Sequence, residues 1–128
     1  SRPPGGGGGG GGGRRGAPRP AARLYWHMVE FGLIREQGEL RAYGAGILSS
    51  HKETIYSTTD PKPLRLRFDP WRVLRSDYFI DDLQPTYFVI EDYAELFAAM
   101  ERLGELLPRA RDAAPIPPGG GDPDDVPA

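Results

Sequence analysis

The chain has 128 residues, a formal net charge of −2 and no cysteine, which excludes disulfides and thiolate metal sites. Its mixed charges give no general attraction to nucleic acid or to an anionic membrane. No apolar run reaches the ~18 residues of a membrane span, and the N-terminus lacks a signal-peptide pattern, so we expect a cytoplasmic protein without nucleic-acid or membrane partners.

Both ends of the chain differ in composition from its middle. Residues 1–22 are dominated by a run of glycines from Gly5 to Gly13, and residues 108–128 are mainly Pro, Gly, Ala and Asp. Neither end has the apolar periodicity that could offset the entropy cost of folding, so we predict that both are disordered. Residues 23–107 remain as the foldable part, which can bury only a marginal core.

In chain order, the first predicted element is a short amphipathic helix. Leu24, Met28 and Phe31 follow the i, i+4, i+7 spacing of an apolar helix face. Trp26 and Glu30 lie four residues apart and should therefore share a neighbouring face of the same helix.

The next segments predict a hairpin followed by less regular structure. Residues 33–43 have the pattern of a β-hairpin, with a turn near Gln37 and Gly38 because glycine readily takes positive φ. A short turn or helix is expected over residues 49–56. The prolines within residues 60–63 then predict a loop.

The second half of the chain predicts two helices and one strand. Asp69 is a plausible N-cap and Pro70 a first helical residue, which together predict a short helix through Arg75. Residues 86–90 are aromatic and β-branched and form the clearest strand. Residues 91–107 begin with two acidic capping residues and continue with helical spacing. We therefore predict an α+β fold, mainly helical, in the order helix, β-hairpin, loops, short helix, strand, helix.

Glu30 is the residue that points most directly to a site. It lies among aromatic and aliphatic neighbours, where a charged carboxylate is costly unless a cation or a metal compensates it. The alternative is an ordinary carboxylate on a helix surface. Residues 44–46 form a small-residue turn that lets the backbone approach a ligand closely, although a plain turn would use the same residues.

Two motifs carry a family resemblance. Residues 24–33, Leu-Tyr-Trp-His-Met-Val-Glu-Phe-Gly-Leu, and residues 42–50, Ala-Tyr-Gly-Ala-Gly-Ile-Leu-Ser-Ser, closely resemble the biopterin-dependent aromatic amino acid hydroxylases. In that family Y-W-F-T-V-E-F-G-L precedes A-Y-G-A-G-L-L-S-S. Residues 76–89 resemble the late segment of the family in its bacterial form, most like phenylalanine 4-monooxygenases, and extend the match to about residue 103.

The resemblance implies a ligand set and a substrate site. It implies that Glu30 is an iron ligand, and that Fe(2+) and tetrahydrobiopterin are the cofactors. Tyr78 is expected to approach the mouth of the active site. Five further site residues are implied: Tyr25 beside iron and pterin, and Trp26, Phe31, Gly46 and Ser49 around the substrate.

The same resemblance exposes a gap. In the family, two histidines of an H-x4-H segment upstream of the glutamate-bearing helix complete the iron site, and no such segment precedes Tyr25 here. His27, where the family usually has Phe, could substitute as a ligand because it lies three residues before Glu30. The favoured alternative is a partly buried side chain replacing an aromatic ring of similar bulk. His51 is expected to be an exposed loop residue.

We therefore expect the C-terminal part of a catalytic domain that hydroxylates an aromatic amino acid with dioxygen, with phenylalanine to tyrosine as the first choice. The fragment lacks two iron ligands, so it should be inactive alone, unless a separate N-terminal fragment complements it in trans. The alternative function is a non-catalytic remnant or interaction module that retains the C-terminal half of the fold.

Overall fold

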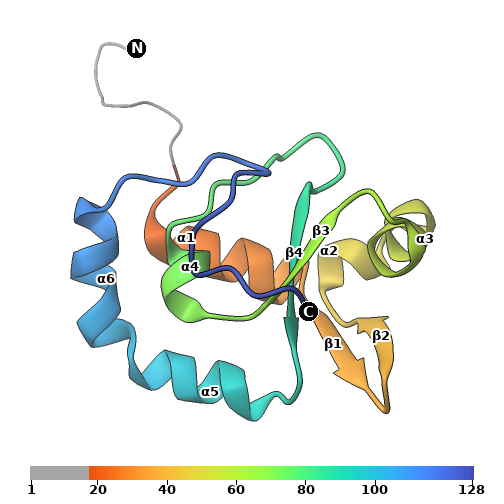
Figure 1. Ribbon diagram of the computed structural model, residues 1–128, viewed down its shortest axis with the longest axis horizontal. Coiled ribbons are helices and arrows are strands. Elements are labelled where there is room, and N and C mark those ends of the chain that lie inside the picture. The colour runs from red at the N-terminus through yellow and green to blue at the C-terminus, as the bar shows by residue number, and fades with distance from the viewer. Residues whose placement is uncertain (1–17) are drawn as a thin grey trace.

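A four-stranded sheet lies at the centre of the computed structural model, which describes residues 18–128 (Figure 1). Its strands are β1 (Leu33–Glu36), β2 (Glu39–Ala42), β3 (Leu64–Arg67) and β4 (Thr86–Ile90). The strand order is β2-β1-β4-β3, with β1 antiparallel to β2 and with β4 parallel to both β1 and β3.

Helices surround this sheet and predominate over strands in the described part of the chain, as the predicted α+β class requires. They are α1 (Pro20–Leu24), the π-helix η1 (Tyr25–Glu30), α2 (Ala45–Leu48), α3 (His51–Thr59), α4 (Pro70–Leu74), α5 (Ala94–Glu101) and α6 (Leu103–Asp112). Within residues 18–128, none of these helices has the length and apolar character needed to cross a membrane.

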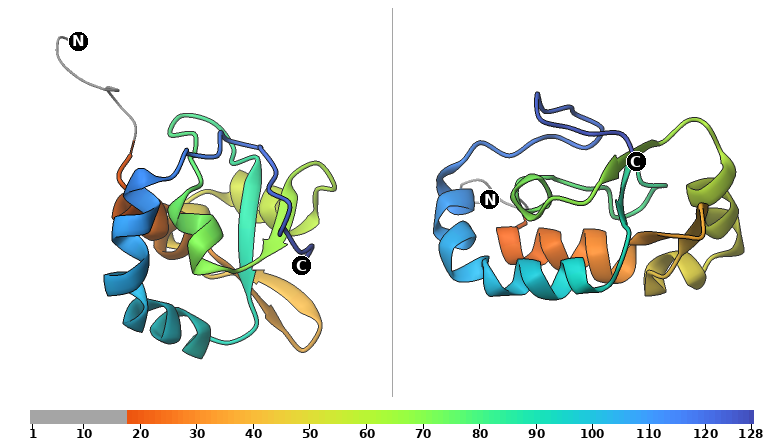
Figure 2. Two further views of the ribbon diagram at one scale, coloured as in Figure 1. Left: turned by 60° about the vertical axis from the view of Figure 1, so that its left-hand side comes forward. Right: turned by 60° about the horizontal axis from the view of Figure 1, so that its bottom comes forward.

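Strand β4 is buried along its whole length because helices cover both faces of the sheet (Figures 1 and 2). Phe88 packs on one face with Met28 of η1 and Val73 of α4. Tyr87 points to the opposite face, where it packs with Ile47 of α2. Burial on both faces explains why this strand is a nearly unbroken apolar run, which made it the clearest strand in the sequence.

The predicted hairpin is confirmed. Strands β1 and β2 are joined by a two-residue turn at Gln37 and Gly38, whose φ angles are 53° and 80°. Positive φ at both central residues is typical of a type I′ turn, the backbone twist of which matches that of the flanking strands. Glycine accepts this conformation at the second position without steric cost.

The first helix differs from the prediction in its hydrogen-bond pattern. It is α-helical only in α1 and continues as the π-helix η1, after which the amide of Phe31 donates to the carbonyl of Trp26 at 3.0 Å. In a π-helix the residues that align are five apart rather than four. Glu30 therefore lies beside Tyr25, and the Tyr25 hydroxyl donates to the Glu30 carboxylate at 3.2 Å.

Strand β3 is not among the predicted elements. Its four residues alternate Leu and Arg, a pattern too short to stand out from the loop before it. In the structure Leu66 enters the core, while the guanidinium of Arg65 donates to the carbonyls of Ser57 at 2.7 Å and Asp60 at 2.6 Å. Arg65 thereby satisfies carbonyls at the end of α3, which have no partner within the helix.

The helices of the second half of the chain lie where they were predicted, but their lengths differ from the predictions. The helix after Asp69 is confirmed as α4, although the Asp69 side chain makes no capping hydrogen bond. The single helix expected over residues 91–107 is two helices, α5 and α6, which meet at Arg102. Figure 2 shows α6 beside α1 and α4, and its Leu106 packs against Leu74.

The prediction of a disordered end is wrong for residues 108–128. Helix α6 extends to Asp112, Ile116 is buried, and the amide of Arg67 in β3 donates to the carbonyl of Val126 at 2.8 Å. This segment lacks apolar periodicity, but its aspartates form ion pairs with arginines of the folded part, which compensates for the weak apolar pattern.

The predicted disorder of residues 1–22 is only partly open to comparison with the structure. Helix α1 begins at Pro20, inside the predicted leader, and proline suits this first helical position because its missing N–H would have no helical partner. Residues 1–17 lie outside the described residues.

We expect Gly44→Ala to destabilise the fold. A Cβ atom at Gly44 would overlap the carbonyl carbon and oxygen of Glu30 and would lie 2.7 Å from the amide nitrogen of Gly32. Backbone atoms cannot rotate away as a side chain could, so the free energy of unfolding should fall by about 1–3 kcal/mol. Urea unfolding followed by circular dichroism measures this change.

Gly104→Ala in α6 is the matched control, because a Cβ atom there would meet no atom within 4 Å other than the neighbouring backbone of its own helix. Removing a glycine from a helix should leave stability unchanged or raise it by up to about 1 kcal/mol. Equal losses in the two variants would contradict the close packing of the turn on the end of η1.

Candidate functional site

Glu30 lies at the C-terminal end of η1, where its side chain is partly exposed. Its side-chain partner is the hydroxyl of Tyr25, which is itself 56% exposed. The hydrogen bond to Glu30 and the negative charge of that carboxylate raise the pKa of the Tyr25 hydroxyl. The carboxylate that the sequence places among apolar neighbours is thus partly exposed here and accepts a hydrogen bond from a hydroxyl.

An aromatic row begins beside this carboxylate. The rings of Trp26 and Phe31 lie 4.9 Å apart at an angle of 33°, and Tyr78 stacks on Trp26 at 4.6 Å with an angle of 12°. Burial raises the pKa of the Tyr78 hydroxyl. The indole N–H of Trp26 is buried and has no hydrogen-bond partner among the described residues. The three rings thus form a packed aromatic row beside Glu30, with one buried donor that is not satisfied within residues 18–128.

The small-residue turn contacts the end of η1 directly. A Cβ atom at Gly46 would lie 3.0 Å from the carbonyl oxygen of Glu30 and 3.0 Å from the ring of Phe31. The hydroxyl of Ser49 donates to the carbonyl of Gly46 at 2.9 Å, and Ser49 is exposed. Capping of the following helix falls to Ser50, whose hydroxyl accepts from the amide of Glu53 at 3.2 Å.

The structure therefore brings together most of the predicted site residues. Trp26, Phe31, Gly46 and Glu30 form one contiguous group, with Tyr25 on Glu30 and Ser49 on Gly46. Tyr78 joins this group through Trp26, and this stacking partner could not be found from spacing because 52 positions separate the two residues.

His27 does not join the group. It is 3% exposed, and its Nε2 lies 3.0 Å from the carbonyl oxygen of Ser76, so Nε2 carries the proton of that hydrogen bond. The ring packs edge-on against Phe88 at 5.1 Å and Tyr78 at 5.7 Å. Burial lowers the pKa of His27 to about 4. His27 thus occupies the core, as the bulk-replacement alternative predicts, and is more buried than expected.

His51 is exposed, as expected, and lies at the first residue of α3 rather than in a loop. A buried polar pair nearby is not among the predicted residues. Glu53, 8% exposed, accepts hydrogen bonds from the hydroxyl of Tyr87 and from the amide of Gln84. Burial and the bond to Glu53 raise the pKa of Tyr87. A lone Glu in a polar helix carries no sequence signal of burial.

The residues of this chain do not form an iron site by themselves. Iron sites for oxygen chemistry commonly use two histidines and one carboxylate. Among residues 18–128, no three His, Cys, Asp or Glu side chains are grouped so that they could hold a metal ion, and residues 1–17 contain none of these four residue types. Glu30 offers one ligand, so any further ligands must come from another polypeptide segment.

Comparison with known proteins places this site in context. Residues 17–113 match the family model described as biopterin-dependent aromatic amino acid hydroxylase. A phenylalanine-4-hydroxylase from Ralstonia nicotianae is 51% identical over 86 residues, which are 67% of this chain and 28% of that protein. The phenylalanine-4-hydroxylase of Chromobacterium violaceum is 45% identical over 106 residues, 82% of this chain and 36% of that protein.

A solved structure gives the same likeness in three dimensions. The iron- and phenylalanine-bound crystal structure of phenylalanine hydroxylase from Chromobacterium violaceum superposes with a TM-score of 0.80 at 44% identity. The match covers 84% of this chain and 40% of that chain. The chain therefore spans well under half the length of the relatives that it matches.

We expect the buried His27 to make the fold sensitive to acid. Its pKa is about 4 in the folded state and near 6.5 when exposed, so the unfolded chain binds more protons between these values. Stability should therefore fall as the pH drops from about 6.5 to about 4, by up to about 3 kcal/mol. His27→Phe should remove this part of the loss. Urea midpoints at pH about 7 and about 4.5 measure it.

His51→Gln is the control. Because His51 is exposed, this variant should keep the acid sensitivity of the parent chain. For each variant, the quantity compared is the change in stability between the two pH values. The absolute stability is not used, because His27→Phe also removes the hydrogen bond to Ser76. An unchanged acid loss in His27→Phe would show that His27 is not the group that titrates.

Proposed function

This chain belongs to the biopterin-dependent aromatic amino acid hydroxylase family, and we propose that it forms the C-terminal part of the catalytic domain of such an enzyme. The proposed reaction is hydroxylation of phenylalanine to tyrosine by dioxygen, dependent on iron(II) and tetrahydrobiopterin. Phenylalanine is favoured because the bacterial relatives at 45–53% identity are phenylalanine-4-hydroxylases, whereas a tyrosine 3-monooxygenase of Caenorhabditis briggsae is 39% identical. A cytoplasmic location remains part of the proposal.

The observation that carries the proposal is the contiguous group around Glu30. In the proposed enzyme Glu30 contributes the carboxylate ligand, and the Tyr25 hydroxyl holds that carboxylate in one orientation beside the pterin. Trp26 and Phe31 bind the substrate ring by burying it against their faces. Iron and tetrahydropterin supply the oxygen chemistry when bound.

The group also contains the two remaining proposed substrate-site residues. Gly46 lets α2 approach the end of η1, so that the substrate site is closed on this side by backbone rather than by a side chain. The hydrogen bond to the Gly46 carbonyl holds the Ser49 hydroxyl in place, and Ser49 remains exposed, so that it can contact a partner across the site. A histidine ligand supplied by another segment is the proposed partner, because an oriented hydroxyl commonly supports a ligating imidazole.

Large apolar side chains are exposed on η1, which bears Glu30, and on the neighbouring α2. Tyr25 is 56% exposed, Val29 48% and Leu48 57%, and these side chains come from η1 and α2, which pack against each other. Large apolar side chains gathered at a site indicate a surface that another segment covers. The proposed cover is an N-terminal catalytic segment that brings two histidine ligands, on the same polypeptide or in trans.

A second candidate function is a non-catalytic remnant or interaction module. The single ligand at Glu30 favours it, since residues 18–128 hold no complete metal-binding group. In that case the apolar surface of η1 and α2 would bind a partner without histidine ligands, and Glu30 would be an ordinary surface carboxylate.

A chimera separates the two functions. Residues 18–113 of this chain would replace the matching segment of the Chromobacterium violaceum enzyme, and the product should oxidise phenylalanine only with iron(II) and tetrahydropterin. Glu30→Gln in the chimera should lower kcat/KM by at least about 100-fold, because even residues that only orient a metal ligand cost 10–100-fold. Phenylalanine-dependent tyrosine formation measures the rate, and retained iron is measured in parallel.

Glu36→Gln is the matched control, because Glu36 is an exposed carboxylate at the end of β1. It should leave kcat/KM within about twofold. A folded chimera that binds no iron would favour the non-catalytic function, and a fully active Glu30→Gln chimera would refute the role of Glu30.

A further inference from the structure

Residues 113–128 form a segment, here called the strap, that leaves α6, crosses α4 and ends beside β3 (Figure 1). It is attached by backbone hydrogen bonds near both ends. The amide of Ile116 donates to the carbonyl of Arg75 at 2.7 Å, and the amide of Arg67 donates to the carbonyl of Val126 at 2.8 Å. The family-model match ends at residue 113, the first residue of the strap.

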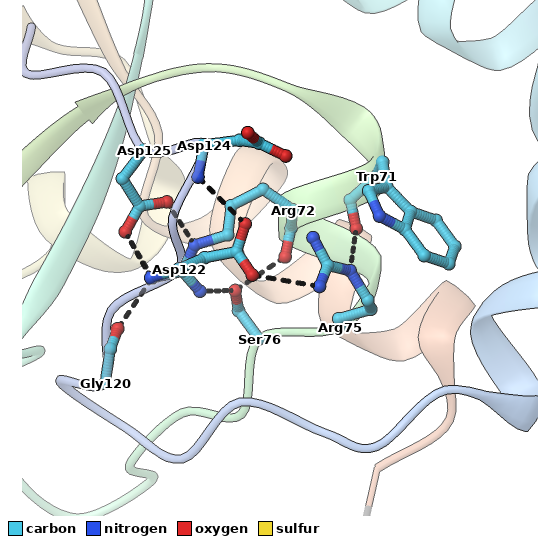
Figure 3. A network of polar contacts seen from close by, with 8 residues as sticks. All are labelled: Trp71, Arg72, Arg75, Ser76, Gly120, Asp122, Asp124 and Asp125. Carbon is cyan, nitrogen blue, oxygen red and sulfur yellow. Dashed lines mark hydrogen bonds and ion pairs between the residues drawn. The ribbon is translucent and has the colours of Figure 1, made fainter.

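Arg72 of α4 is the main anchor of the strap (Figure 3). Its side chain is almost fully buried and forms a two-point ion pair with Asp125, at 2.7 Å through Nε and 3.2 Å through Nη2. Nη2 also donates to the carbonyl of Gly120 at 2.6 Å, and Nη1 donates to the hydroxyl of Ser76. A buried guanidinium with this many partners is strongly destabilised when its carboxylate is removed.

A second ion pair supports the first. Arg75 donates to Asp122 at 3.2 Å, and its guanidinium lies 4.5 Å from the centre of the Trp71 ring. The amide of Asp122 in turn donates to the carboxylate of Asp125 at 2.9 Å, so the two anchors share one turn of the strap. Asp124 lies between them but is exposed, and no ion pair of its side chain occurs among the described residues.

The anchor connects to the helix that bears Glu30. Ser76, which Arg72 holds through the hydroxyl, accepts the hydrogen bond of His27 at its carbonyl, at 3.0 Å. His27 belongs to η1 and follows Trp26, and Tyr78, two residues after Ser76, stacks on Trp26. Polar contacts thus run without interruption from the strap through Arg72 and Ser76 to η1.

We propose that Asp125 is a positioning residue: acting through Arg72 and Ser76, it holds His27 and the stacked pair of Trp26 and Tyr78 in place beside Glu30. The strap is thereby part of the support of the candidate site, although it contacts neither Glu30 nor the proposed substrate residues in the described contacts. The inference rests on the proposed function in one respect: the functional role of Glu30 comes from that proposal, whereas the coupling is argued from contacts alone.

Nuclear magnetic resonance of the full chain tests the coupling without metal, pterin or partner. The amide exchange of Arg67 and Ala128 reports whether the strap is attached, since both amides donate across the strap–β3 contact. The imidazole nitrogens of His27 and the indole N–H of Trp26 report the state of η1. The exposed His51 gives an internal reference signal.

In Asp125→Asn we expect the Arg67 and Ala128 amides to exchange at least about tenfold faster, because a charge-assisted hydrogen bond is replaced by weaker ones. The His27 and Trp26 signals should shift, with the His51 signal unchanged. Asp122→Asn, which weakens the ion pair with Arg75 and leaves Asp125 in place, should give smaller changes of the same kind. Asp124→Asn, the matched control, should resemble the parent chain, and Asp125→Glu should partly restore the His27 signal.

A strap that detaches while the His27 and Trp26 signals stay in place would overturn the proposal, because the strap would then be only a local structural element. Unchanged amide exchange would overturn it as well. If Asp125→Asn does not fold, the comparison of Asp122→Asn with Asp124→Asn decides by the same criteria. None of these outcomes depends on the activity of the chimera, so the two proposals fail independently.

Discussion

The contact between the end of η1 and the turn before α2 determines where Glu30 lies. The amides of Tyr43 and Gly44 both donate to the carbonyl of Gly32 at 3.1 Å, which draws the turn onto the last residues of η1. Only a residue without a Cβ atom allows this approach at Gly44. The π-helical register of η1 then places Glu30 beside Tyr25 and turns His27 into the core. The candidate site, the aromatic row and the link to the strap all follow from this arrangement.

Local patterns were sufficient for the elements whose cause is local. The hairpin follows from Gly38 at a two-residue turn, and β4 follows from apolar side chains needed on both faces of a central strand. The π-helix could not be predicted, because the residues that form it also suit an α-helix. The order of the strap depends on ion pairs between positions about fifty residues apart, which no local composition reveals.

The sequence named residues for the candidate site, but it could not show how they lie relative to one another. The two motifs indicated Tyr25, Trp26, Glu30, Phe31, Gly46 and Ser49 through a family resemblance, and the structure brings them into one contiguous group. The partner of Trp26, the stacked Tyr78, is set by the path of the chain after α4 and carries no spacing signal. A single carboxylate cannot complete a metal site within residues 18–128, which is why a covering segment with further ligands is central to the proposed function.

The most direct test is a crystal structure, with iron(II) added, of this chain assembled with an N-terminal catalytic segment from a bacterial phenylalanine hydroxylase. The account predicts that the Glu30 carboxylate coordinates the iron together with two histidines of the added segment, whether or not it keeps the hydrogen bond from the Tyr25 hydroxyl. Trp26 and Phe31 should then face the open side of the metal. Iron bound elsewhere, with Glu30 still directed to solvent and paired only with Tyr25, would contradict the account.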